Sequence, residues 1–308
     1  MAVDSSHRRR APRGVLPVAL LVVLFLIAVS VYAVSVLRKS EEPVLVERCT
    51  ASVPGAVYSL SPDRASVAAL ISAIAVRRDL PPRAASIAIA TAIQESGLRN
   101  LDYGDDAGPD SRGLFQQRPS QGWGTQEQVM DPVYAINTFY DALVKVPGYL
   151  DLPLTVAAQT VQRSAFPDAY AAHEPQARAF ASALTGQSAA ALTCTLRPPE
   201  ASGDPEAVLA ALAAAYGTVD ITGNDTGDNT GDNAGGNDNT AGARLTVAGS
   251  GTYGWSVAQW AVANADALSI DSVAHAGRRW TRATGTWDPA SAVDTEVVLT
   301  VYRTAGQS

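Results

Sequence analysis

The sequence predicts an α+β protein with an N-terminal transmembrane helix, a mostly α-helical domain and a small C-terminal α+β domain. An uncharged run of 22 residues lies near the N-terminus, at 16–37. Helix start and stop signals then follow one another up to residue 195, and strand-like segments alternate with helical ones after residue 203. These features predict three parts: residues 1–39, 40–200 and 203–308.

The uncharged run at 16–37 is long enough to cross a membrane as a helix, because the hydrocarbon core is about 30 Å thick. The apolar region of a signal peptide is shorter, about 7–15 residues. The small residues "AVS" at 28–30 and 33–35 resemble a cleavage site, however, and leave secretion after cleavage open. Arg8, Arg9 and Arg10 precede the run, and basic flanks are typical of the cytoplasmic side. We expect a single-pass protein of the cell membrane, with a cytoplasmic N-terminus and the remaining domains on the extracytoplasmic side.

Composition narrows the classes of partner. The chain has 30 acidic and 23 basic residues, a net charge of −7. An acidic exterior argues against a nucleic-acid partner, because phosphate binding relies on Lys and Arg. One predicted span argues against a transporter, which needs several helices around a central site. The cysteines and histidines lack the spacing of a zinc site, so we expect no metal and no cofactor.

The two cysteines, Cys49 and Cys194, both fall on the predicted extracytoplasmic side, where disulfides persist. They stand at the two ends of the alanine-rich helical stretch. We therefore predict a disulfide that ties the ends of one domain together. The alternative is two free, buried thiols.

Helices between residues 49 and 195 are predicted from their ends. Ser61 followed by Pro62 is a typical helix start, and Pro82 starts a second helix that stops at Gly97. The isoleucines of this second helix lie on different faces, with alanines between them, so we expect a central, buried helix. A polar, glycine-rich stretch at 100–119 then predicts a loop or small hairpins. Further helices are predicted at 131–146, 152–164 and 169–186.

The C-terminal part predicts a small α+β domain. A helix is expected between Asp204 and Gly217, and a second at 253–268, with an apolar stripe that includes Trp255. Strands are expected at 218–222, 243–249 and 295–304, with a hairpin at 270–282 that turns at residues 276–277. The insert 222–243 is rich in Asn, Asp and Gly and is expected to be disordered. We favour a long hairpin tip over an interdomain linker, and expect 203–308 to fold alone.

Glu95 stands in the last turn of the predicted buried helix. The carbonyl end of a helix disfavours an anion, so this position either reaches water or raises the pKa of the carboxyl group. A general acid in glycosidic cleavage must be protonated near neutral pH, and burial raises a carboxyl pKa in the required direction.

The segments "ESG" at 95–97 and "GLFQ" at 113–116 resemble the soluble lytic transglycosylase family of the lysozyme superfamily. The later segments "MDPVYAINTFYDALV" and "VAAQTVQRSAFPDAY" are similar to further conserved segments of that family. The resemblance covers about residues 60–185 and is greatest to actinobacterial cell-wall proteins with one N-terminal anchor. Val161 and Gln162 stand where the family has Tyr-Asn, which removes an aromatic hydroxyl near the catalytic carboxylate.

The resemblance implies a lysozyme-like fold and a peptidoglycan lytic transglycosylase that cleaves the bond between N-acetylmuramic acid and N-acetylglucosamine. Glu95 is then the single acid and base, and peptidoglycan glycan strands are the partner. Substrate contacts are expected from Ser96, Tyr103, Gln116, Gln117, Tyr134, Gln162 and Tyr170.

Two alternatives stay open. The first is an inactive peptidoglycan-binding or assembly module of the same fold, which Val161 favours. The second is a lysozyme-type hydrolase that uses a second carboxylate from the loop, where the candidates are Asp102, Asp105, Asp106 and Asp110.

Overall fold

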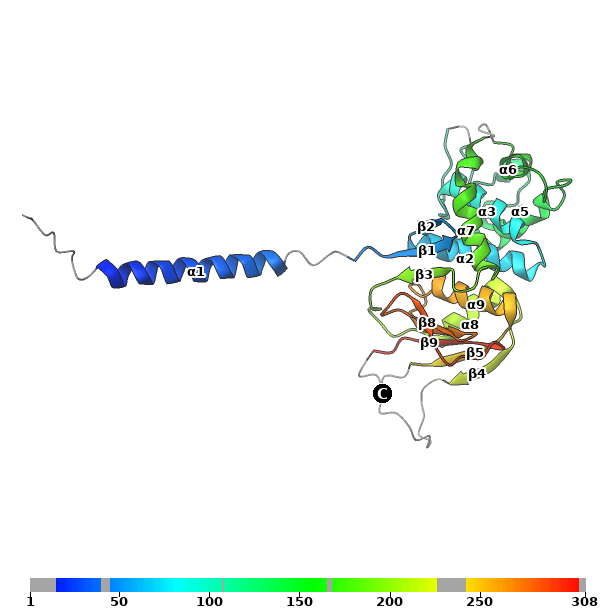
Figure 1. Ribbon diagram of the computed structural model, residues 1–308. Helices are drawn as coiled ribbons and strands as arrows, with labels where there is room; N and C mark the ends of the chain where they lie inside the picture. Colours follow the sequence, from blue (N-terminus) through cyan, green and yellow to red (C-terminus); the bar gives the residue numbers. More distant parts are fainter. Residues whose placement is uncertain (1–14, 40–44, 107, 165–167, 226–241, 305–308) are drawn as a thin grey trace, which may run out of the picture. The chain divides into compact units, whose positions relative to one another are not determined.

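The computed structural model describes residues 15–39, 45–106, 108–164, 168–225 and 242–304 (Figure 1). Its contacts divide the chain into two compact units, Met1–Leu45 and Val46–Ser308. The predicted α+β class is confirmed, because helices stand beside two antiparallel sheets in the second unit.

The first unit contains helix α1 (Val15–Lys39), which includes the uncharged run at 16–37. Side-chain exposures are described for residues 21–35 of this helix. Within the described residues, no helix combines the length and apolar character that a membrane crossing requires. The membrane anchor therefore stays a prediction.

The second unit contains the remaining elements. Its helices are α2 (Pro62–Arg77), α3 (Pro82–Ser96), η1 (Pro119–Gln121), α4 (Gln126–Met130), α5 (Pro132–Leu143), α6 (Leu154–Gln162), η2 (Ala169–His173), α7 (Glu174–Leu184), α8 (Pro205–Tyr216) and α9 (Gly251–Ala263). Its strands are β1 (Arg48–Val53), β2 (Ala56–Leu60), β3 (Leu192–Thr195), β4 (Ile221–Asp225), β5 (Arg244–Ala248), β6 (Ile270–His275), β7 (Arg278–Thr281), β8 (Trp287–Pro289) and β9 (Glu296–Val301).

The part of the second unit from residue 46 to the end of β3 at residue 195 is called the helical half here, and the rest of the unit is the second half. Helix α3 is the centre of the helical half. It starts at Pro82 and ends at Gly97, which adopts φ 65°, the left-handed conformation in which glycine carries no steric penalty. Every residue from Ala84 to Ala92 is buried, and α2, α5, α6 and α7 all pack against the helix. The predicted central position of this helix is confirmed.

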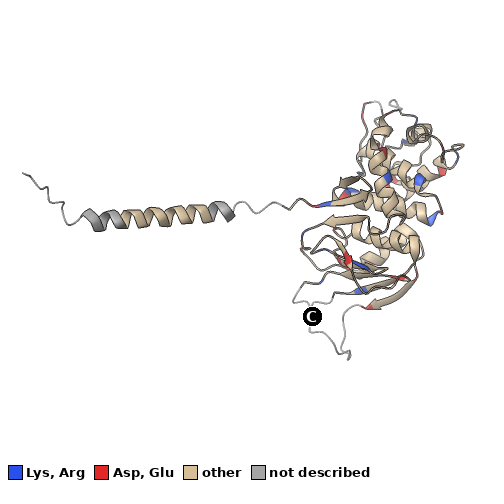
Figure 2. Ribbon diagram, viewed as in Figure 1, with Lys and Arg blue, Asp and Glu red and all other residues tan. Residues whose placement is uncertain are grey.

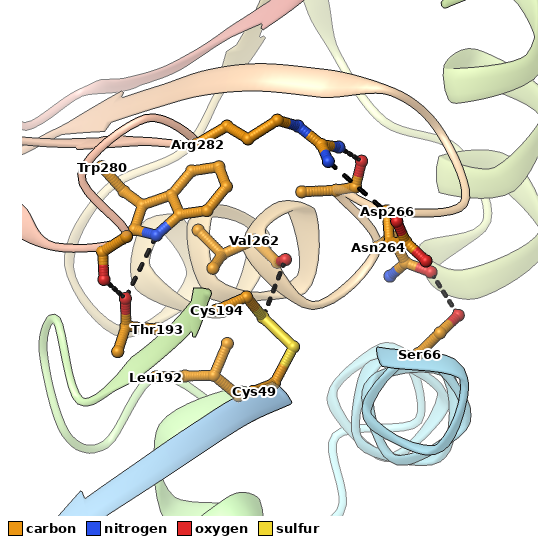
Figure 3. Close-up of a disulfide and its surroundings, with 12 residues drawn as sticks. Cys49, Ser66, Leu192, Thr193, Cys194, Val262, Asn264, Asp266, Trp280 and Arg282 are labelled. Atoms are coloured by element: carbon orange, nitrogen blue, oxygen red, sulfur yellow. Dashed lines mark hydrogen bonds and ion pairs between the residues drawn. A yellow bond between two sulfur atoms is a disulfide. The ribbon is translucent and has the colours of Figure 1, made fainter. Parts of the chain in front are cut away.

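A three-stranded antiparallel sheet, in the order β2-β1-β3, was not predicted from the sequence. It pairs the start of the second unit with a segment about 140 residues later, and Cys49 lies directly opposite Cys194 in its register. The predicted disulfide between these two cysteines is confirmed. Figure 3 shows the bridge beside α9, where the sulfur of Cys194 lies 3.3 Å from the carbonyl oxygen of Val262.

The second sheet is antiparallel, in the order β4-β5-β9-β6-β7-β8. The predicted hairpin turn is confirmed at Ala276 and Gly277, which have φ 45° and 76°. Strands β4 and β5 pair with each other, as a hairpin across the Asn/Asp/Gly-rich insert requires. The predicted disordered insert is too long, because residues 222–225 belong to β4; its segment 226–241 lies outside the described residues.

Helix α9 lies between this sheet and the helical half. It packs against β6 and β9, and also against α2, α7 and β3. All its residues from Ser256 to Ala263 are buried, so the predicted single apolar stripe is wrong. From Ser256 onward α9 has no solvent face, whereas Trp255, which the predicted stripe included, is only partly buried.

Polar contacts also join the two halves. The side chain of Gln259 accepts from Leu192 N at 2.8 Å and donates to Ala183 O at 2.7 Å. Ser66 donates to Asn264 at 2.5 Å, and Trp280 Nε1 donates to Thr193 Oγ1 at 3.1 Å (Figure 3). The predicted boundary at residues 200–203 therefore does not separate two compact units.

Candidate active site

Glu95 lies in the last turn of α3 and is half-buried. The apolar sequence of α3 drives the helix into the core, and Gly97 ends it one turn beyond the last fully buried stretch. The carboxylate is thus carried to the edge of the core by a helix that cannot rotate without exposing apolar surface.

The neighbouring Ser96 joins this helix end to the "GLFQ" segment. Its hydroxyl donates to Leu114 O at 2.8 Å. Gly113 adopts φ 78°, and a Cβ there would lie 2.2 Å from Val129 O, so only glycine fits. Gln116 has φ 49°, an uncommon conformation for a residue with a side chain. The segment is therefore held in one tight path beside Glu95.

Two side chains from elsewhere in the sequence reach Glu95. The hydroxyl of Tyr170, in η2, donates to Glu95 Oε1 at 2.6 Å. The amide of Gln162, at the end of α6, also hydrogen-bonds the Glu95 side chain. The same amide donates to Phe115 O at 2.8 Å. Gln162 therefore links the carboxylate, helix α6 and the "GLFQ" segment.

The environment raises the pKa of Glu95. Burial has the largest effect, because removal of water disfavours the carboxylate. Hydrogen bonds from Tyr170 and Gln162 lower the pKa, and the negative charge of Asp105 raises it to a lesser degree. Burial and the Glu95 charge together raise the pKa of Tyr170, so its hydroxyl stays protonated and remains a donor. The net result is a carboxyl group that holds its proton more tightly than a free glutamate.

The loop aspartates have different surroundings. Asp105 is exposed and accepts a hydrogen bond from Gly108 N at 2.8 Å. Asp110 accepts from the side chain of Ser120, from Ser120 N at 3.0 Å and from Arg118 Nε at 2.9 Å. These donors, Ser120 above all, hold the pKa of Asp110 well below its ordinary value. Asp102 and Asp106 are exposed. Asp105 is thus the loop aspartate whose charge acts on Glu95.

The other predicted binding residues divide into two groups. Ser96 and Gln117 are buried and bonded to backbone carbonyls, Leu114 O and Ala135 O, which favours a structural role over the predicted substrate contact. Gln116 is partly buried and donates to Gly113 O at 3.2 Å. Tyr134 is partly buried, and Tyr103 has 59% of its surface exposed. Among the described residues, the side chains that the structure brings together at the carboxylate are therefore those of Glu95, Gln162 and Tyr170.

The role of Tyr170 could not be read from the sequence. The resemblance indicated that an aromatic hydroxyl is missing at Val161, which the structure places in α6 with 7% exposure. Tyr170 instead supplies a hydroxyl to Glu95 from 75 residues along the chain. The resemblance had indicated Tyr170 only as a substrate contact, and nothing local in the sequence indicates that its hydroxyl reaches Glu95.

Metal chemistry has no candidate cluster here: among the described residues, no three His, Cys, Asp or Glu side chains come close enough together to hold a metal ion.

Comparison of the sequence with known proteins found no relative. No model of a known protein family matches the chain, and no curated protein matches its sequence.

Proposed function

We propose that the protein is a peptidoglycan lytic transglycosylase that uses Glu95 as its single acid and base. The observation that carries the proposal is the Glu95 carboxyl group, half-buried at the end of α3, with a raised pKa and with Tyr170 and Gln162 fixing its orientation. A proton donor near neutral pH needs this combination of burial and orientation.

Protonated Glu95 donates its proton to the glycosidic oxygen that follows N-acetylmuramic acid. Because Oε1 accepts from Tyr170, we expect the transferred proton on Oε2. As the bond to the leaving sugar breaks, the 6-hydroxyl of the muramic acid attacks its own anomeric carbon. The ionised Glu95 takes up the proton of that hydroxyl, which leaves a 1,6-anhydro ring and restores the acid.

A lysozyme-type hydrolase is the second candidate, and Asp105 is the observation that favours it. Most glycosidases use two carboxylates, and the charge of Asp105 acts on Glu95. Asp105 is exposed on a loop, however, and its carboxylate already accepts from Gly108 N. We therefore place it as a modulator of Glu95, and expect Asp105→Asn to remain active.

An inactive binding module was favoured by Val161 alone. The hydrogen bond from Tyr170 to Glu95 supports activity, because it gives the carboxylate an aromatic hydroxyl despite Val161.

The proposal includes a membrane anchor. The uncharged run at 16–37 lies inside α1, and the basic residues before it favour a cytoplasmic N-terminus. The catalytic half would then act on cell wall close to the membrane.

The test is digestion of purified peptidoglycan by the full chain and by its Glu95→Gln variant. Release of soluble glycan by the wild type and its loss in the variant would support the proposal. Equal release by both proteins would refute the role of Glu95.

A further inference from the structure

A pocket lies beside the candidate active site, on the side of Gln162. Its volume is about 730 Å³, within the range of small-ligand sites. It is lined by the segment after η1, by one face of α5 and by the end of α6. Gln162 both lines the pocket and hydrogen-bonds Glu95. The pocket and the surroundings of the carboxylate therefore share the side chain of Gln162.

The charges that line the pocket are unevenly compensated. Asp141 is held by Arg78, with an N–O distance of 2.5 Å. Lys145 and Arg163 also line the pocket, and the described residues offer neither side chain an ion pair or hydrogen bond. The pocket thus carries excess positive charge in a chain of net charge −7. Figure 2 shows the mixture of basic and acidic positions across the second unit.

The pocket also has an aromatic wall. Trp123 lines the pocket together with the preceding Gly122, and its side chain is partly exposed. An indole face packs well against the apolar face of a sugar or a short peptide. The guanidinium of Arg163 can bind a carboxylate through two parallel N–H donors, and Lys145 adds a point charge. This combination fits a ligand that joins a sugar to a carboxylate-bearing chain.

We propose that this pocket binds the carboxylate-bearing stem peptide of the muramic acid whose glycosidic bond lies at Glu95. The inference rests on the proposed function and adds a determinant of substrate choice to it. The enzyme would then select glycan strands that still carry peptides, and Lys145 and Arg163 would be its specificity residues.

A binding experiment tests the pocket without any cleavage. The probe is an N-acetylmuramyl peptide with free carboxylates, titrated into the full chain in detergent while tryptophan fluorescence is followed. The Lys145→Gln/Arg163→Gln variant should bind about tenfold more weakly, because it loses two exposed charge pairs and each contributes up to about fivefold. Arg278→Gln/Arg279→Gln, which removes the same charge from exposed positions on β7, should bind like the wild type.

Three results would overturn the inference: equal binding by both double variants, equal binding of a probe with amidated carboxylates, or preference for a phosphate-bearing wall polymer. A second measurement compares cleavage of intact strands with cleavage of strands stripped of peptide. The Lys145→Gln/Arg163→Gln variant should lose activity on intact strands alone. If the wild type cleaves neither substrate, the proposed function fails, whereas the binding result still decides the role of the pocket.

Discussion

At the scale of single residues, the environment of Glu95 balances opposing influences on one proton. Burial and the charge of Asp105 favour the neutral acid, whereas the hydrogen bonds from Tyr170 and Gln162 favour the carboxylate. A group that must first donate and then recover a proton benefits from such a balance, because neither protonation state is strongly disfavoured. Tyr170 and Gln162 act through Glu95 and are positioning residues in this account.

Tyr170→Phe should shift the pH dependence of cleavage. The variant loses a donor that lowers the pKa of Glu95, so that pKa rises. Cleavage starts from protonated Glu95, so the basic limb of kcat/KM should move to higher pH. The optimum rate should also fall about tenfold or more, since a hydrogen bond to a charged group is lost. Tyr103→Phe, at an exposed position, is the control, and a basic limb that stays in place in Tyr170→Phe would contradict the assigned role.

Glu95→Gln should make the protein more stable at neutral pH. The folded-state pKa of Glu95 is raised, so the stability that its neutral form provides is complete below the unfolded-state pKa of about 4.3. That stability is lost as the pH rises through the folded-state value. The variant should therefore melt above the wild type at pH 7, and the difference should shrink toward pH 4. A variant that melts below the wild type at pH 7 would show that the ionised Glu95 carboxylate does not destabilise the folded protein.

At the scale of elements, the sequence predicted the helix ends and turns that depend on residues close together in the chain. The ends of α2 and α3 follow from prolines and Gly97, and the β6–β7 turn follows from the residues at 276–277. The sheet β2-β1-β3 was missed because its third strand comes from far along the chain, although "SVPGAVYSL" carries a hairpin signal. The burial of α9 on both sides was missed for the same reason, since its two partner surfaces are distant in sequence.

The disulfide should stabilise the second unit as a whole. The bridge closes a loop of 145 residues, for which the chain-entropy model gives about 5 kcal/mol as an upper figure. Cys49→Ala/Cys194→Ala should lower a single melting transition, because Cys194 packs against Val262 of α9. Two separate transitions, with only one of them lowered, would show that the two halves unfold independently. The melt is best followed by calorimetry.

At the scale of the whole molecule, the two halves of the second unit share one core. Helix α9 is covered by both, and the side chain of Gln259 satisfies backbone groups of the helical half. Composition had indicated a boundary near residue 200, since the helical stretch ends there and strands follow. Composition indicates which helices and strands form. It does not indicate which of their surfaces pack against each other. For this reason the position of Glu95 at the end of a buried helix was predictable, whereas the packing of that half against α9 was not.

Removal of 203–308 should therefore destabilise the helical half. A chain that ends at residue 200 would expose the apolar surfaces of α2 and α7 that α9 covers, and should aggregate or lose its cooperative melt.

A milder test is Gln259→Ala, which leaves the buried Leu192 N–H without its partner at a cost of about 1–3 kcal/mol. Gln187→Ala, at an exposed position, should be neutral. A truncated chain that melts cooperatively and retains activity would restore the two-domain interpretation.

We propose that Glu95 alone catalyses cleavage, with internal attack by the 6-hydroxyl. The most direct measurement is mass spectrometry of the glycan ends produced by the purified full chain, with and without borohydride reduction. We expect muramic acid ends that are lighter by one water than hydrolysed ends and that resist reduction, and we expect no such ends from Glu95→Gln. Reducible ends of full mass, abolished by Asp105→Asn as well as by Glu95→Gln, would contradict the account and identify a two-carboxylate hydrolase.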